Sequence, residues 1–115
     1  MLEINTEFRK GILFTRLSGI LSDDTNDKFQ KFLETMIGRD NIKYIVFNIK
    51  DLKYIDLDGI KTLLNYNQIL NNKGGKAVIC GIENELTKIR IYNSHMLNYM
   101  FEASDELGAI NYLSL

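Results

Sequence analysis

The sequence predicts a single α/β domain with a mixed central sheet of four or five strands and about four helices, mainly on one face. A chain of 115 residues has room for one domain, spanning residues 1–115. Its 45% hydrophobic and 25% charged residues are typical of a folded globular protein. Strand-like and helix-like segments alternate along it, which favours parallel strands joined by right-handed crossovers.

The N-terminal segments predict a hairpin followed by a helix. Apolar and polar residues alternate from Leu2 to Phe8 and from Ile12 to Leu21, on either side of the turn signal Lys10-Gly11. Ser22 and the acids that follow it are typical of a helix start. Apolar residues then recur at helical spacing as far as Gly38, namely Phe29, Phe32, Leu33, Met36 and Ile37.

The central segments predict a strand, a helix and a second strand. Ile42–Ile49 is nearly continuously apolar and β-branched, as expected of a strand covered on both faces. A short passage over residues 51–55 leads through Asp56–Gly59 into a helix that ends at Asn71–Gly75. Lys76–Ile82 is predicted as another buried strand. The apolar stripe of the helix consists of Ile60, Leu63, Leu64, Ile69 and Leu70.

The C-terminal segments predict two more helices. Glu83–Asn93 is expected to be helical, and its inward residues are predicted to be Leu86, Ile89 and Tyr92. A short strand is expected near Met100-Phe101. Ser104 is expected to cap a last helix that carries Leu107, Ile110 and Leu113.

Composition excludes several classes of function. The 14 basic and 15 acidic residues give a net charge of -1, which argues against a nucleic-acid partner. No apolar run approaches the ~18–20 residues of a membrane span, so no membrane partner is expected. Cys80 is the only cysteine and His95 the only histidine, so neither a disulfide nor a Cys/His zinc site is expected. We therefore expect a soluble, cytoplasmic protein without a metal or other cofactor, in which Cys80 is a buried, inert thiol.

The tetrapeptide Asp56-Leu57-Asp58-Gly59 is the most informative motif, because it lies between a strand and a helix start. In one interpretation Asp58 is the N-cap of the helix and Gly59 allows tight packing. In a second, the motif resembles the first motif of haloacid-dehalogenase-type phosphatases. This resemblance implies Asp56 as nucleophile, Asp58 as acid/base and a magnesium ion. Ile60 stands where that family has Thr or Ser.

A third interpretation covers almost the whole chain, from Leu2 to Leu113. It rests on the order and spacing of four segments: GILS at Gly19–Ser22, Tyr44–Leu64, NNKGGKAVICGI at Asn71–Ile82 and the amphipathic pattern from Leu86 to Leu113. In this order and spacing the chain resembles a STAS domain, the fold shared by bacterial anti-sigma factor antagonists and the cytoplasmic ends of sulfate transporters.

The resemblance implies a switchable binding module rather than an enzyme. In the antagonists a Ser at the start of the second helix is phosphorylated by a partner that is both anti-sigma factor and kinase. The unmodified antagonist captures that partner, and the phosphoryl group breaks the complex. The expected partner is therefore an anti-sigma factor or a related kinase-like protein, with a scaffold assembled from other STAS proteins as the alternative.

This chain departs from the family's Asp-Ser-Ser/Thr-Gly motif. Asp56 and Gly59 match, Leu57 replaces the first hydroxyl residue, and Asp58 occupies the phosphoacceptor position. Ser22 stands where many antagonists have an Asp after Gly-x-Leu. We hypothesise that Asp58 fixes one state of the switch, since no serine kinase can modify it. The predicted partner face comprises Ser22, Asp23, Asp24, Asp56, Leu57, Asp58, Gly59, Lys61, Thr62 and Asn65.

Overall fold

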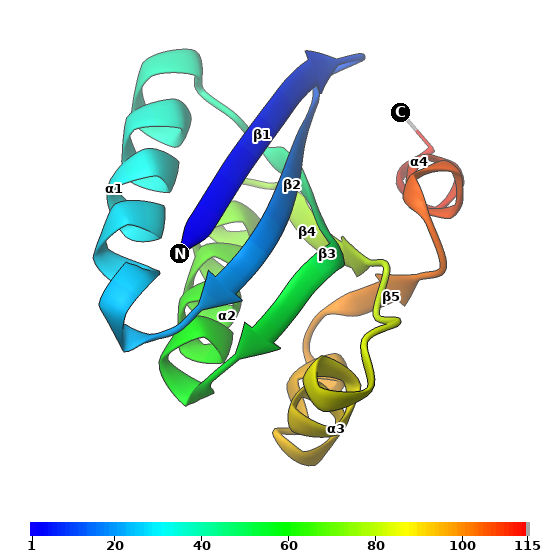
Figure 1. Cartoon of the computed structure of the whole chain (residues 1–115). Helices are drawn as coiled ribbons and strands as arrows, with labels where there is room; N and C mark the ends of the chain where they lie inside the picture. Colours follow the sequence, from blue (N-terminus) through cyan, green and yellow to red (C-terminus); the bar gives the residue numbers. More distant parts are fainter. Residues whose placement is uncertain (115) are drawn as a thin grey trace.

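The computed structural model describes residues 1–114 and contains one five-stranded sheet (Figure 1). Its spatial order is β1-β2-β3-β4-β5, in which β1 is antiparallel to β2 and all other neighbours are parallel. The strands are β1 (Leu2–Arg9), β2 (Ile12–Leu21), β3 (Tyr44–Ile55), β4 (Lys76–Cys80) and β5 (Phe101–Ala103). The helices are α1 (Asp23–Asp40), α2 (Leu57–Asn72), α3 (Glu85–Asn93) and α4 (Glu106–Leu113), with a 3-10 turn over Met96–Asn98. The predicted α/β domain with a mixed sheet is confirmed.

The sheet is covered unequally on its two faces. The longest helices, α1 and α2, pack on one face over the main core, which includes Phe29, Phe47 and Leu63 (Figure 1). The short helix α4 lies against the other face, over a smaller cluster that includes Phe14 and Val78. No helix within residues 1–114 is long and apolar enough to cross a membrane.

Strand β3 is longer than predicted. It continues through Ile55, so the passage over residues 51–55 belongs to the strand. The register between β2 and β3 shifts between Arg16 and Ser18 and again between Gly19 and Ile20. These irregularities keep Leu52 and Ile55 fully buried although the neighbouring residues are polar.

The inward side of α3 was predicted incorrectly. Leu86, Ile89 and Tyr92 are 48%, 53% and 48% exposed, whereas Thr87 and Ile91 are buried. The helix is short and contacts the sheet through this narrow face alone, so its apolar stripe is left facing outward. In α4, Leu107 is likewise 65% exposed. The N-cap of α4 is Asp105 rather than Ser104, because the Asp105 carboxylate accepts from the backbone N–H of Gly108 at 2.8 Å.

A charged cluster fastens α4 to the sheet. The guanidinium of Arg16 donates to both carboxylate oxygens of Glu106 at 2.8 Å, and the Asn48 side-chain amide donates to the same carboxylate at 2.8 Å. Arg16 also donates to Glu7 at 3.0 Å. The hydrogen bond from Arg16 holds the pKa of Glu106 below its ordinary value.

We expect Glu106→Gln to lower the free energy of unfolding at pH 7 by ~1–2 kcal/mol, since charge-assisted hydrogen bonds are lost. Because the pKa of Glu106 is lowered in the folded state, its stabilisation is complete above the ordinary value of 4.5 and is lost as the pH falls below it. Urea titrations from pH 3 to pH 7 should therefore show a weaker pH dependence in the variant. The control Glu7→Gln, at a more exposed site, should cost less than ~0.5 kcal/mol. Equal losses in the two variants would contradict this account.

Cys80 is fully buried in β4, and burial raises the pKa of its thiol to about 12. Since the thiolate is the reactive form, we expect native Cys80 to resist alkylation by iodoacetamide at pH 8. Labelling, followed by mass spectrometry, should become complete only in denaturant. Fast labelling of the folded protein would show that β4 opens readily.

Candidate functional site

The N-termini of α1 and α2 meet at the carboxylate of Asp56. Its Oδ1 accepts from the backbone N–H of Gly59 at 2.9 Å, which caps α2. Its Oδ2 accepts from the backbone N–H of Asp23 at 3.0 Å, in the first turn of α1. The backbone N–H of Asp56 donates to the carbonyl of Leu21 at 3.1 Å, next to the last pair of β2 and β3. Asp56 therefore joins both strand-to-helix junctions, as expected where parallel strands end.

Gly59 allows this junction to close. A Cβ atom at this position would lie 2.9 Å from a Leu21 side-chain carbon, from an Ile55 side-chain carbon and from the Leu21 carbonyl oxygen. Any side chain would push the first turn of α2 away from the strand ends. The sequence prediction that Gly59 permits tight packing is confirmed. Its role in the site is to let α2 start close to the strand ends.

Asp58 is not the N-cap of α2, because Asp56 holds that position. It lies in the exposed first turn, and its backbone carbonyl accepts from the Thr62 hydroxyl at 3.1 Å. The Asp58 carboxylate is thus presented to solvent at the positive end of the helix dipole. Both oxygens of Asp56 are engaged by backbone N–H groups, which disfavours the phosphatase interpretation that made Asp56 a nucleophile.

The structure brings most of the predicted partner face together. Asp23, Asp24, Leu57, Lys61 and Asn65 are all exposed near Asp58 or the Asp56 junction. A hollow of about 270 Å³ between α1 and α2 is lined by Asn26, Gln30, Asp58, Lys61, Thr62 and Asn65.

Two predicted contact residues are turned inward instead. Thr62 is 4% exposed, and its hydroxyl donates to the Asn26 side chain at 2.7 Å, so it links α2 to α1. Ser22 is 9% exposed and is the N-cap of α1, where its backbone N–H donates to the Thr25 hydroxyl at 3.0 Å. Both residues belong to the predicted partner face, but little of either is exposed, because Ser22 is used at a helix end and Thr62 between helices.

An apolar groove beside Leu57, the residue before Asp58, was not predicted from the sequence. It has a volume of about 440 Å³ and lies between the start of α2 and α3. Leu57 is 58% exposed, and with Leu86 and Ile89 it gives the groove apolar walls. The full lining is Leu57, Ile60, Leu86, Ile89, Arg90, Asn93 and Ser94. The spacing of Leu86 and Ile89 predicted that they face the core. It identified an apolar face of α3 but not the side to which that face turns.

Arg90 supplies the positive charge of this groove. Its guanidinium lies over the ring of Tyr54, 4.8 Å from the centroid. Such cation–π packing fixes the long side chain while leaving its N–H groups available for hydrogen bonds. The site therefore combines exposed apolar walls, one arginine and the neighbouring carboxylate of Asp58. These are features of a surface that binds a protein segment.

The sequence pattern that defines the STAS domain matches residues 3–108. The chain belongs to the STAS domain family. An anti-sigma F factor antagonist from Paenibacillus polymyxa is 32% identical to it over 81 residues, which cover 70% of this chain and 69% of that protein.

Solved structures of anti-sigma factor antagonists share the fold of the whole domain. SpoIIAA in its unphosphorylated form superposes with a TM-score of 0.81 at 17% identity, covering 98% of both chains. The phosphorylated form of SpoIIAA from Bacillus gives a TM-score of 0.71 at 20% identity, covering 96% of this chain and 98% of that one. An anti-sigma factor antagonist from Mycobacterium paratuberculosis gives 0.88 at 13% identity, covering 100% and 96%. The predicted STAS fold is confirmed.

Proposed function

We propose that this STAS domain is a non-catalytic, cytoplasmic binding module of the anti-sigma antagonist kind, with Asp58 at the position of the phosphoacceptor serine. The observation that carries the proposal is the position of Asp58. Asp56 caps the start of α2, whereas Asp58 is exposed and lines the α1–α2 hollow. The preceding residue, Leu57, lines the α2–α3 groove. A charge at this point is well placed to control a partner that covers both sides.

Asp58 imitates only part of a phosphorylated serine. A carboxylate carries a charge of about -1, whereas a phosphoserine carries about -1.5 to -2 and has a third oxygen. The helix dipole tolerates either charge. We propose that the domain is held in a state resembling the phosphorylated form, so that its abundance or a different partner controls the pathway in place of a kinase.

The partner surface would extend over the α2–α3 groove. A helix of the partner that places two apolar side chains at spacing i, i+3 or i, i+4 would contact Leu57, Leu86 and Ile89. An acidic side chain beside them would meet Arg90. Carboxylates of the partner that come close to Asp58 would be repelled. The surface around Asp58 therefore favours a basic or neutral segment of the partner.

Affinity capture tests the proposal directly. Wild-type protein and Asp58→Ser are used as parallel baits in a lysate of the native host, and retained proteins are identified by mass spectrometry. We expect a kinase-like anti-sigma protein to be recovered with both baits, in larger amount with Asp58→Ser. Recovery only of other STAS proteins, or of no protein, would contradict the proposal and favour a scaffold or an unrelated partner.

A further inference from the structure

We propose that the free edge of β1 pairs with the same edge of a second copy of this chain, about a two-fold axis at Thr6. The resulting dimer would have one continuous sheet through both domains. This inference does not depend on the proposed function, because β1 is the edge strand at one end of the sheet order, whereas the Asp58 site lies at the ends of β2 and β3.

Alternate residues of β1 turn their backbone groups away from the sheet. The backbone N–H of Ile20 donates to the carbonyl of Met1 at 2.9 Å, so the odd-numbered residues of β1 are those that bond to β2. The even-numbered residues therefore direct their N–H and C=O groups outward. The Leu2 carbonyl does so, since it accepts from the Lys28 ammonium at 2.8 Å. This bond covers the start of the edge and leaves the stretch from Ile4 to Phe8 available for pairing.

Among the antiparallel registers centred on Asn5, Thr6 or Glu7, only the one centred on Thr6 avoids like charges. With Thr6 opposite Thr6, Glu3 lies opposite Arg9 and Ile4 lies opposite Phe8 of the second copy. Outward backbone groups then face each other at Ile4, Thr6 and Phe8. Moving the register by two residues in either direction places Glu3 opposite Glu7, or Glu7 opposite Glu7. Charge therefore favours the register centred on Thr6 over these two neighbouring registers.

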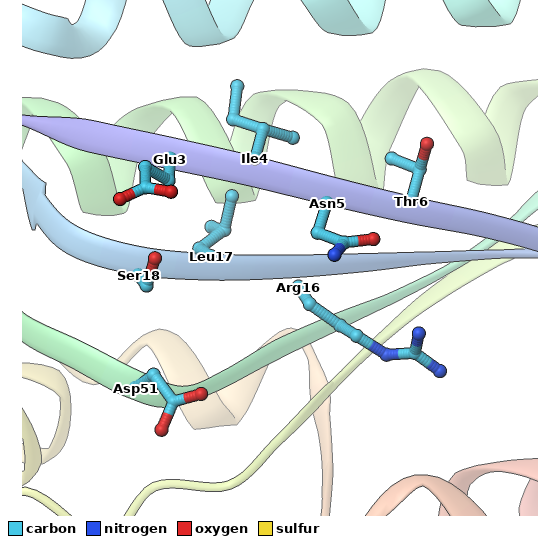
Figure 2. A pocket seen from close by; sticks show the side chains of 8 residues that line it. All are labelled: Glu3, Ile4, Asn5, Thr6, Arg16, Leu17, Ser18 and Asp51. Carbon is cyan, nitrogen blue, oxygen red and sulfur yellow. The ribbon is translucent and has the colours of Figure 1, made fainter.

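The side chains on the face of β1 that points toward the helices also fit those of the second copy. Figure 2 shows Ile4 and Thr6 projecting to the side opposite that of Asn5 and Arg16. Phe8 shares the alternation of Ile4 and is 59% exposed. A hollow of about 410 Å³ beside Ile4 is lined by Ile4, Lys28, Lys31, Phe32 and Thr35. In the proposed register Phe8 of the second copy lies next to this hollow, so an exposed ring on each chain meets an apolar recess on the other.

Sedimentation equilibrium over a range of concentrations tests this dimer. We expect the mass of the wild type to rise from 13.3 kDa towards twice that value and to stop there. Glu3→Arg and Arg9→Glu should each raise the dissociation constant by ~10-fold, because each places like charges opposite one another twice. The double variant Glu3→Arg/Arg9→Glu should return to within ~3-fold of the wild type. Circular dichroism verifies that each variant is folded.

A second variant tests the backbone pairing. Thr6→Pro removes an outward N–H at the two-fold axis, which the hydrogen bonds of the monomer do not use, and should abolish the dimer. The proposal is overturned if the wild type remains a monomer up to ~1 mM. It is also overturned if the double variant fails to recover association while folded, or if the wild type forms larger particles. Partner capture by the monomeric variants reports on the Asp58 site separately.

Discussion

Ile89→Asp is expected to weaken binding of the proposed anti-sigma partner by at least ~100-fold while changing the free energy of unfolding by less than ~0.5 kcal/mol. Ile89 is 53% exposed and lines the groove between α2 and α3. A carboxylate there would have to be desolvated when an apolar partner segment docks. The free domain loses little, because the side chain is already largely in water. Titration calorimetry with the purified partner measures the affinity, and urea denaturation measures the stability.

Tyr92→Asp is the matched control for this prediction. Tyr92 lies on the same helix and is 48% exposed, but it does not line the groove. The variant carries the same added charge on α3, so it should alter the affinity by less than ~3-fold. Equal losses in the two variants would indicate a general charge effect. Unchanged affinity in Ile89→Asp would remove the groove from the binding surface.

Asp56→Ala is expected to lower the free energy of unfolding by ~2 kcal/mol, the largest stability loss among the surface carboxylates of this site. The alanine leaves the backbone N–H groups of Gly59 and Asp23 without their carboxylate acceptor. The two helix starts would then lose their shared acceptor, and α1 and α2 would be joined by packing and by the hydrogen bond from Thr62 to Asn26. Asp56→Asn retains one acceptor oxygen and should lie between alanine and the wild type.

Asp58→Ala supplies the comparison within the same turn. Because the Asp58 carboxylate acts on α2 only through the helix dipole, its loss should cost no more than ~0.5 kcal/mol. Urea denaturation followed by circular dichroism measures all three variants under identical conditions. If Asp58→Ala were as destabilising as Asp56→Ala, the assignment of capping to Asp56 would be wrong.

Local signals in the sequence were sufficient for most of the fold. The alternation around Lys10-Gly11 predicted the hairpin, and Ser22 is found at the N-cap where its sequence context placed it. The capping assignment at α2 was displaced by two residues, since Asp56 and Asp58 are both good caps and only the backbone decides between them. The hydrogen bond from the Asp23 backbone to Asp56 joins residues far apart in sequence, so no local pattern predicts it.

The exposed apolar residues of α3 could not be distinguished from core residues by their spacing in the sequence. Leu86, Ile89 and Tyr92 recur at helical spacing, and this stripe is the same whether a helix faces a core or a partner. In the folded chain it is Thr87 and Ile91 that occupy the inward face of α3, so the apolar stripe faces outward. A helix whose buried residues include a threonine while leucine and isoleucine are exposed is a signal for an interface, but it becomes visible only with the tertiary structure.

We propose that the charge of Asp58 sets the binding state of the domain. The most direct test of this claim is titration of the captured anti-sigma protein with the wild type, Asp58→Ser and Asp58→Ala. If Asp58 imitates a phosphorylated serine, both variants should bind at least ~10-fold more tightly than the wild type, and Asp58→Ser alone should accept phosphate from ATP in the complex. Equal affinities for the three proteins would contradict the claim and reduce Asp58 to an ordinary surface residue of the first helical turn.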